Sequence, residues 1–220
     1  MFYRVCLLKG ILYPKYASYQ LEQAEKINGV WIKSILIILI SAFALFFSSF
    51  SGIGTESLSK EAAILKPSDY EMHKLYFAAG KAVWGVFYPL LMILLPAVIF
   101  WTLTDIAFKK IVTIQLFAVF LLVVSKVLAL SSASILEIST VSSPFSLAVI
   151  AQYVTSNEFI IYLLENLSIF HLWAIYIQYI YLKKLSEKKP RTTLIIVVSV
   201  NIFFWLMSAL FSYIKFEMIL

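Results

Sequence analysis

Long apolar runs separated by short polar segments dominate the pattern of this 220-residue chain. Five runs, at about 33–52, 82–104, 111–134, 158–182 and 192–214, are each long enough for a helix to cross the hydrocarbon core of a bilayer, which is roughly 30 Å thick. The pattern therefore predicts an all-α polytopic membrane protein. We expect a bundle of about five transmembrane helices in a single membrane domain over residues 1–220.

The first 32 residues are predicted to be a cytosolic and interfacial segment. Residues 1–13 are apolar but are interrupted by Arg4 and Lys9 and end at Pro14, which suits an amphipathic segment lying in the membrane interface. We expect no signal peptide, because no small-residue cleavage site follows. Residues 18–29 are polar and helix-prone, and Asn28-Gly29 is expected to end that helix.

The second span is expected to begin above the membrane. Ser68 and Glu71 match a capping box in the mixed-charge segment 53–80, which predicts a helix that begins near Asp69 and continues into the span. A second short segment, residues 143–154, is too short to cross and is expected to lie at the interface or to dip into the membrane.

Two features of the spans predict how the helices pack. Pro89 and Pro96 lie seven residues apart on one face of the second span, and each removes a backbone hydrogen bond, which predicts a kink or a loosened turn. Ser34, Ser41 and Ser48 recur every seven residues in the first span. Such a stripe of small residues favours close helix packing, although chance serines in a long apolar run would give the same pattern.

Composition supports the membrane class and argues against enzymatic chemistry. With 62% apolar and 14% charged residues, the chain cannot cover a soluble surface. The single cysteine, Cys6, excludes an internal disulfide and a multi-cysteine metal site. The two histidines, His73 and His171, form no HExxH motif, and both a Gly-rich phosphate loop and a G-x-S-x-G elbow are absent. We therefore expect no enzyme, no metal and no cofactor.

The basic residues predict the orientation. With the N-terminus inside, the short inner segments carry twelve Lys and Arg residues and the outer segments carry five, among them Lys60, Lys66 and Lys215. The positive-inside rule then favours a cytoplasmic N-terminus and an external C-terminus in the cell membrane.

Two charged residues fall inside the predicted spans. Lys126 lies roughly 12 Å inside the outer end of the third span, and Glu165 roughly 10 Å inside the outer end of the fourth. We expect them to pair, because an isolated charge in the bilayer is costly. The polar residues expected on the same inner surfaces are Gln115 on the third span and Ser168, His171 and Gln178 on the fourth.

This intramembrane polar group allows more than one interpretation. It would act as a structural ion pair that fixes which helices meet, as a polar docking groove, or as a proton or ion relay. The spacing alone does not choose among them.

A second candidate surface is the basic inner face. It is predicted to contact anionic lipid head groups or a protein partner rather than nucleic acid, since its cations flank apolar segments. Its members are Arg4, Lys9, Lys109, Lys110, Lys183, Lys184, Lys188, Lys189 and Arg191.

Two local segments carry a family resemblance: LLKGILYPKYASYQL before the first span, and FWTLTDIAFKKIVTIQLFAVFLLVVSKVLAL from the end of the second span through the third. They resemble the Yip family of five-span membrane proteins, in particular its bacterial branch. LLKGILYPKYASYQL is similar to the family's pre-membrane stretch. FWTLTDIAFKKIVTIQLFAVFLLVVSKVLAL resembles its junction between the second and third spans, where a polar turn with Phe108 and Lys109 precedes a span. The layout of five spans, a long first outer loop and a basic last inner loop is also similar. Eukaryotic relatives are implicated in vesicle trafficking with small GTPases.

The resemblance implies a function without catalytic residues. Some bacterial relatives accompany ABC-type exporters as accessory subunits that protect against antimicrobial peptides. We therefore expect a non-enzymatic accessory or scaffold subunit, whose partner would be the permease or ATPase of an exporter of peptides or toxic amphiphiles. The alternative is a small ion- or proton-coupled transporter or channel that uses the Lys126, Glu165 and His171 relay. A homo-oligomer is compatible with either function.

Overall fold

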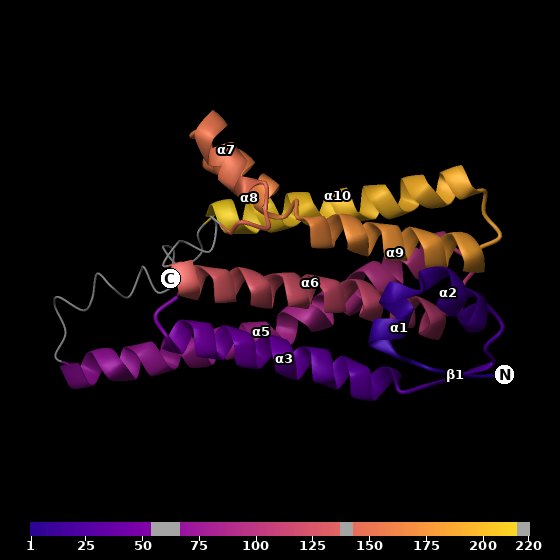
Figure 1. The fold of residues 1–220 in the computed structure, drawn as a ribbon, viewed down its shortest axis with the longest axis horizontal. Coiled ribbons are helices and arrows are strands. Elements are labelled where there is room, and N and C mark those ends of the chain that lie inside the picture. The colour runs from indigo at the N-terminus through magenta and orange to yellow at the C-terminus, as the bar shows by residue number, and fades with distance from the viewer. Residues whose placement is uncertain (54–66, 137–142, 215–220) are drawn as a thin grey trace.

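The computed structural model describes residues 1–53, 67–136 and 143–214, and this part of the chain is almost entirely helical (Figure 1). Its elements in chain order are β1 (Phe2–Arg4), α1 (Leu7–Leu12), α2 (Pro14–Glu22), β2 (Lys26–Asn28), α3 (Val30–Phe50), α5 (Pro67–Leu103), α6 (Phe108–Leu136), α7 (Ala148–Val154), α8 (Glu158–Glu165), α9 (Ile169–Leu185) and α10 (Pro190–Ile214). Residues 54–66, 137–142 and 215–220, which include Lys60, Lys66 and Lys215, lie outside the described residues.

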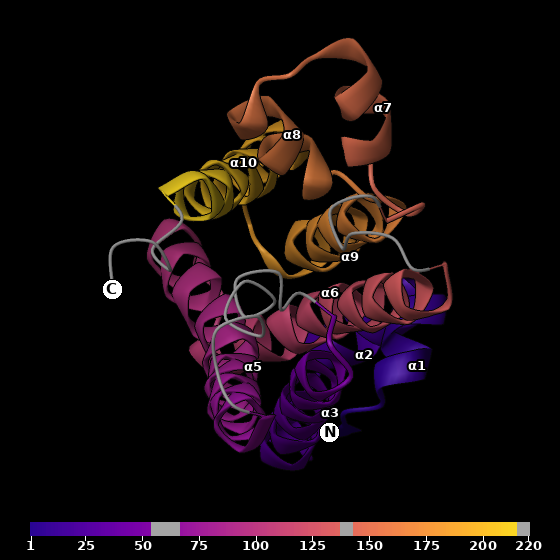
Figure 2. The same cartoon turned by 90° about the vertical axis from the view of Figure 1, so that its left-hand side faces the viewer.

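Within these ranges, four helices are long and apolar enough to cross a membrane: α3, α5, α6 and α10. The chain is therefore an all-α membrane protein. The long helices run side by side, and α6 lies between α3 and α5 on one side and α9 and α10 on the other (Figures 1 and 2). In α6, 61% of the most apolar stretch is buried, against 17–33% in the other three, so α6 is the central helix and the others present apolar faces outward.

The closest helix contact is between α3 and α5. A Cβ atom added to Gly85 of α5 would lie 2.6 Å from Ala42 Cα and 3.0 Å from the Ser41 carbonyl oxygen. Ser41 and Ser48 are buried, so two of the three serines of the predicted stripe lie in the interior. Small residues on both helices therefore allow the two backbones to approach.

Helix α5 begins at Pro67 and continues without interruption through both Pro89 and Pro96 to Leu103. The expected helix that starts before the second span is present. The side chain of Ser68 lies outside the described part, so the capping box itself is not described. Both internal prolines are buried against neighbouring helices.

The predicted fourth span, 158–182, is not one helix, and this expectation was wrong. Helix α8 ends at Glu165 and α9 begins at Ile169. The Ser168 side chain caps α9 by accepting a hydrogen bond from the His171 backbone N–H at 3.3 Å. Between α8 and α9, where the helical hydrogen bonds are interrupted, the Leu167 backbone carbonyl accepts a hydrogen bond from the Leu147 N–H, just before α7, at 3.1 Å.

Residues 1–28 fold into a small unit that we call the N-terminal cap. β1 and β2 pair in parallel, with Tyr3 opposite Ile27, and α1 and α2 connect them. The predicted helix over 18–29 was wrong at its end, because α2 stops at Glu22 and residues 26–28 form a strand. Gly29, with φ of 87°, turns the chain from β2 into α3 in a left-handed conformation that glycine adopts without strain.

Candidate functional site

The N-terminal cap is held on the end of the bundle by a buried aromatic contact. The Tyr181 hydroxyl of α9 donates a hydrogen bond to the Gly10 carbonyl at 2.9 Å. The Phe117 ring of α6 lies against Tyr181, with 5.3 Å between the ring centres. A Cβ atom on Gly10 would lie 2.5 Å from the Phe117 ring, so only glycine allows α1 to approach this closely.

Tyr3 of β1 lies beside Tyr181 in the same contact and is itself buried. Burial raises the pKa of Tyr3 to about 12. The hydroxyl therefore stays protonated at physiological pH and remains available as a hydrogen-bonding group.

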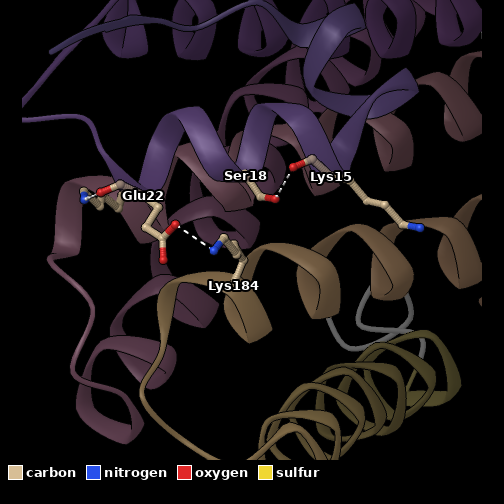
Figure 3. A network of polar contacts seen from close by, with 5 residues as sticks. Lys15, Ser18, Glu22 and Lys184 are labelled. Atoms are coloured by element: carbon tan, nitrogen blue, oxygen red, sulfur yellow. Dashed lines mark hydrogen bonds and ion pairs between the residues drawn. The ribbon is translucent and has the colours of Figure 1, made fainter.

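Two lysines, Lys184 and Lys110, fasten the end of α2 to the bundle, and Figure 3 shows the pair of Lys184 with Glu22. The Lys184 ammonium of α9 pairs with the Glu22 carboxylate at 2.9 Å. The Lys110 ammonium of α6 donates to the Glu22 backbone carbonyl at 2.6 Å, which satisfies an oxygen at the C-terminus of α2. Lys110 and Lys184 were expected on the free basic face, but both are engaged inside the chain.

The remaining cations of the predicted basic face are exposed. They are Arg4, Lys9, Lys109, Lys183, Lys188, Lys189 and Arg191. They lie on the N-terminal cap, at the start of α6, and from the last turn of α9 to the first turn of α10, so the structure places them all at one end of the bundle (Figure 1).

The two turns at this end are joined through Asp105. Its carboxylate accepts hydrogen bonds from the Ser186 hydroxyl at 3.1 Å and from the Glu187 backbone N–H at 3.2 Å. Hydrogen bonds from its own backbone N–H and from that of Glu187 lower the pKa of Asp105. Sequence reasoning missed this residue, because the contact joins positions about eighty residues apart.

The outer face of the N-terminal cap is rich in exposed apolar and aromatic side chains. They are Phe2, Leu8, Leu12, Tyr13, Tyr16 and Tyr19. The opposite face, which includes Val5, Leu7 and Ile11, is buried in the core. Apolar side chains therefore lie on both faces of the cap, and the buried face contacts the helices of the bundle.

A chain of amide side chains crosses the interior of the bundle. Gln178 of α9 donates to Gln115 of α6 at 3.0 Å, and Asn201 of α10 donates to Gln178 at 2.7 Å. A cavity of about 20 Å³ adjoins the three amides and Pro96. The Gln115 Nε2 atom is buried and has no hydrogen-bond partner among the residues that the structure describes. The cavity has room for about one water molecule, and its size does not suit a larger substrate.

Gln115 therefore does not belong to the group around Lys126 with which it was predicted. Eleven residues separate them on α6, which is about 16 Å along the helix axis. Their spacing puts the two residues on the same side of α6, but Gln115 contacts Gln178 of α9 and Lys126 contacts Tyr88 of α5.

The remaining predicted polar residues gather near the break between α8 and α9. The Ser168 hydroxyl lies 2.8 Å from His171 Nδ1. Within the described part of the chain, the expected ion pair between Lys126 and Glu165 is not formed; the Lys126 ammonium instead lies 5.8 Å from the centre of the Tyr88 ring of α5.

Across the described ranges, no group of three His, Cys, Asp or Glu side chains is arranged to hold a metal ion. Asn166, at the end of α8, forms hydrogen bonds both to its own helix and to α10. Its amide donates to the Tyr162 carbonyl at 3.1 Å and accepts from Ser208 of α10 at 3.4 Å.

Comparison of the chain with models of known protein families, with curated proteins and with solved structures finds no match. The resemblance to the Yip family therefore stays a prediction.

Proposed function

We propose that this chain is a non-enzymatic accessory or scaffold subunit of a larger membrane complex, and that the N-terminal cap is its contact surface. The observation that carries the proposal is the two-sidedness of the cap. One face is fastened to α6 and α9 through Gly10 and Glu22. The other face presents exposed apolar, aromatic and basic side chains. Aromatic residues and arginine are enriched at protein interfaces, which supports this role.

The proposal includes a topology of five crossings. The broken α8–α9 segment would be the fourth crossing, between the long helices α6 and α10. The cap would lie on the cytoplasmic face of the cell membrane and the C-terminus outside, because the basic residues gather at the end of the bundle that carries the cap.

For the partner we propose the permease or ATPase of an ABC-type exporter of peptides or toxic amphiphiles, with a role in resistance to antimicrobial peptides. This identification depends on the resemblance to the bacterial Yip branch. The small volume of the internal cavity favours a contact role over transport by the chain alone.

The proposal is tested by purifying the tagged protein gently from its native membrane and identifying the proteins recovered in stoichiometric amount. We expect an exporter subunit with the unaltered chain, and reduced recovery with Leu8→Ser combined with Leu12→Ser. The matched control is Leu194→Ser with Ile195→Ser, which changes exposed apolar residues of α10 outside the cap. Recovery of the chain alone, or equal recovery with both pairs, would contradict the proposal.

A second candidate function is a small ion- or proton-coupled transporter. The break between α8 and α9 favours it, because discontinuous helices commonly form the ion sites of transporters, and here Ser168, His171 and Glu165 lie at the break. In proteoliposomes this candidate predicts a cation or proton flux that Glu165→Gln abolishes while the thermal unfolding temperature stays unchanged.

A further inference from the structure

A cleft of about 240 Å³ opens on the N-terminal cap between β1, α1 and α2. The side chains that matter for its chemistry are Tyr3, Arg4, Lys9, Tyr13, Tyr16 and Gln20. Its volume lies below the roughly 300–1,000 Å³ typical of sites for drug-sized ligands, so it suits a small group.

The cleft carries positive charge that the cap does not neutralise. The only acidic residues in positions 1–28 are Glu22 and Glu25. Glu22 pairs with Lys184, and Glu25 pairs with the amino terminus at 3.2 Å. Among the described residues, neither Arg4 nor Lys9 forms an ion pair.

The hydrogen-bonding groups of the cleft are arranged as donors. Gln20 Nε2 donates to the Tyr16 hydroxyl oxygen at 2.9 Å. Because that oxygen already accepts a hydrogen bond, the hydroxyl hydrogen of Tyr16 is free to donate to another acceptor. The arginine and lysine add charged donors, so the cleft offers several donors to one acceptor-rich group.

We propose that this cleft binds a phosphate group, carried either by the head group of an anionic phospholipid or by a free phosphate. Phosphate supplies the negative charge and the acceptor oxygens that the cleft lacks, and the Arg4 guanidinium matches it in a bidentate geometry. The exposed side chains of Leu8 and Leu12 on the same helix α1 form an apolar neighbourhood that suits a lipid. The site stands independently of a protein partner for the cap.

The test measures binding to the purified, delipidated full-length protein in detergent. The three probes are phosphatidylglycerol, zwitterionic phosphatidylcholine and inorganic phosphate. Saturable binding of phosphatidylglycerol that phosphatidylcholine does not reproduce supports a lipid head group. Saturable binding of inorganic phosphate, with competition against the lipid, supports a free phosphate. If neither anionic probe binds saturably, the proposal is overturned.

Variants decide whether the cleft is the site. Arg4→Gln with Lys9→Gln is expected to weaken binding by about tenfold or more, because both charged donors are lost. The control, Lys15→Gln with Lys26→Gln, makes the same charge change in the cap but outside the lining of the cleft. An equal loss in both pairs would mean general surface attraction and would overturn the site.

A milder variant keeps the test decisive if the charge-removing pair does not fold. Tyr16→Phe removes only the hydroxyl and is expected to weaken binding by about threefold, because one neutral hydrogen bond is lost. Its thermal unfolding without ligand should match that of the unaltered protein. Unchanged affinity in a folded Tyr16→Phe protein would overturn the assignment.

Discussion

At the scale of single residues, the interior is specified by uncharged amides. Gln115, Gln178 and Asn201 tie α6, α9 and α10 together in one chain of hydrogen bonds. In a bilayer such bonds fix which helices meet, because an apolar face alone does not distinguish a neighbouring helix from lipid.

Gln178→Leu is expected to destabilise the bundle by about 1–2 kcal/mol, because it removes two interhelical hydrogen bonds and leaves Gln115 without its partner. The measurement is reversible unfolding in mixed micelles, with a double-mutant cycle over Gln115→Leu and Gln178→Leu. We expect coupling between the two positions, and additive effects would contradict the account. Ser199→Leu, at an exposed position of α10, serves as the control and should change stability little.

Gly10→Ala is expected to loosen the N-terminal cap, at a cost of about 1–3 kcal/mol, because the added methyl group would overlap the buried Phe117 ring. Hydrogen exchange over residues 1–28 measures the effect and should show lost protection there. Gly80→Ala is the matched control, since a Cβ at that position of α5 meets no atom within 4 Å. Equal protection in the two variants would show that the contact with Phe117 does not hold the cap.

From the sequence it was possible to predict several of the polar residues that lie in the interior, but not which residues they contact. Gln115 and Lys126 fall on one nominal face of α6, which suggested a single group. Gln115 instead meets Gln178, while Lys126 is exposed beside Tyr88. Periodicity gives the face of a helix, but the partner depends on which helix lies opposite at that depth.

At the scale of elements, four of the five predicted apolar runs coincide with long apolar helices among the described residues, and the interruption of the run 158–182 was not predicted. Hydropathy is continuous across 158–182, so it predicts one helix. Ser168 nevertheless caps a new helix, and the preceding residues bond to the segment before α7. Ser168 was predicted only as a polar residue on the face of one continuous helix, because the apolar pattern does not show where a helix is interrupted.

The contact between the turn before α6 and the turn before α10 is expected to depend on pH. The Asp105 pKa is lowered in the folded chain, so its contribution is present above its ordinary pKa of about 3.9 and is lost as the pH falls through the lowered value. The protection factor of the Glu187 amide should therefore fall as the pH drops below the ordinary pKa of an aspartate, about 4.

Asp105→Ala should give a low protection factor of the Glu187 amide at every pH. The amide of Thr193, which bonds to the Lys189 carbonyl inside the start of α10, is the internal control and should keep its protection. A Glu187 amide that behaves identically in both proteins would contradict the role given to Asp105.

At the scale of the whole molecule, apolar residues reach the surface along α3, α5 and α10, and basic residues gather at the end with the N-terminal cap. Hydropathy and charge predicted this distribution directly. The cap itself was not predicted, because the parallel pairing of β1 with β2 joins residues that are more than twenty positions apart in two very short strands.

The native cysteine reports the orientation. Cys6 is exposed on the cap, so a membrane-impermeant maleimide should label it only after the cells are permeabilised. Ser156→Cys in a Cys6→Ser background places the reporter in the exposed segment between α7 and α8 and should be labelled in intact cells. The reverse pattern would contradict a cytoplasmic cap.

The central claim is that the N-terminal cap is the surface by which this protein contacts its partner. The most direct measurement places a photo-crosslinking amino acid at Leu12, on the exposed face of the cap, and at Ile195, an equally apolar and exposed position of α10. After irradiation of native membranes, we predict a discrete adduct with one other protein from position 12 and none from position 195. No discrete adduct from position 12, or the same adduct from both positions, would contradict the claim.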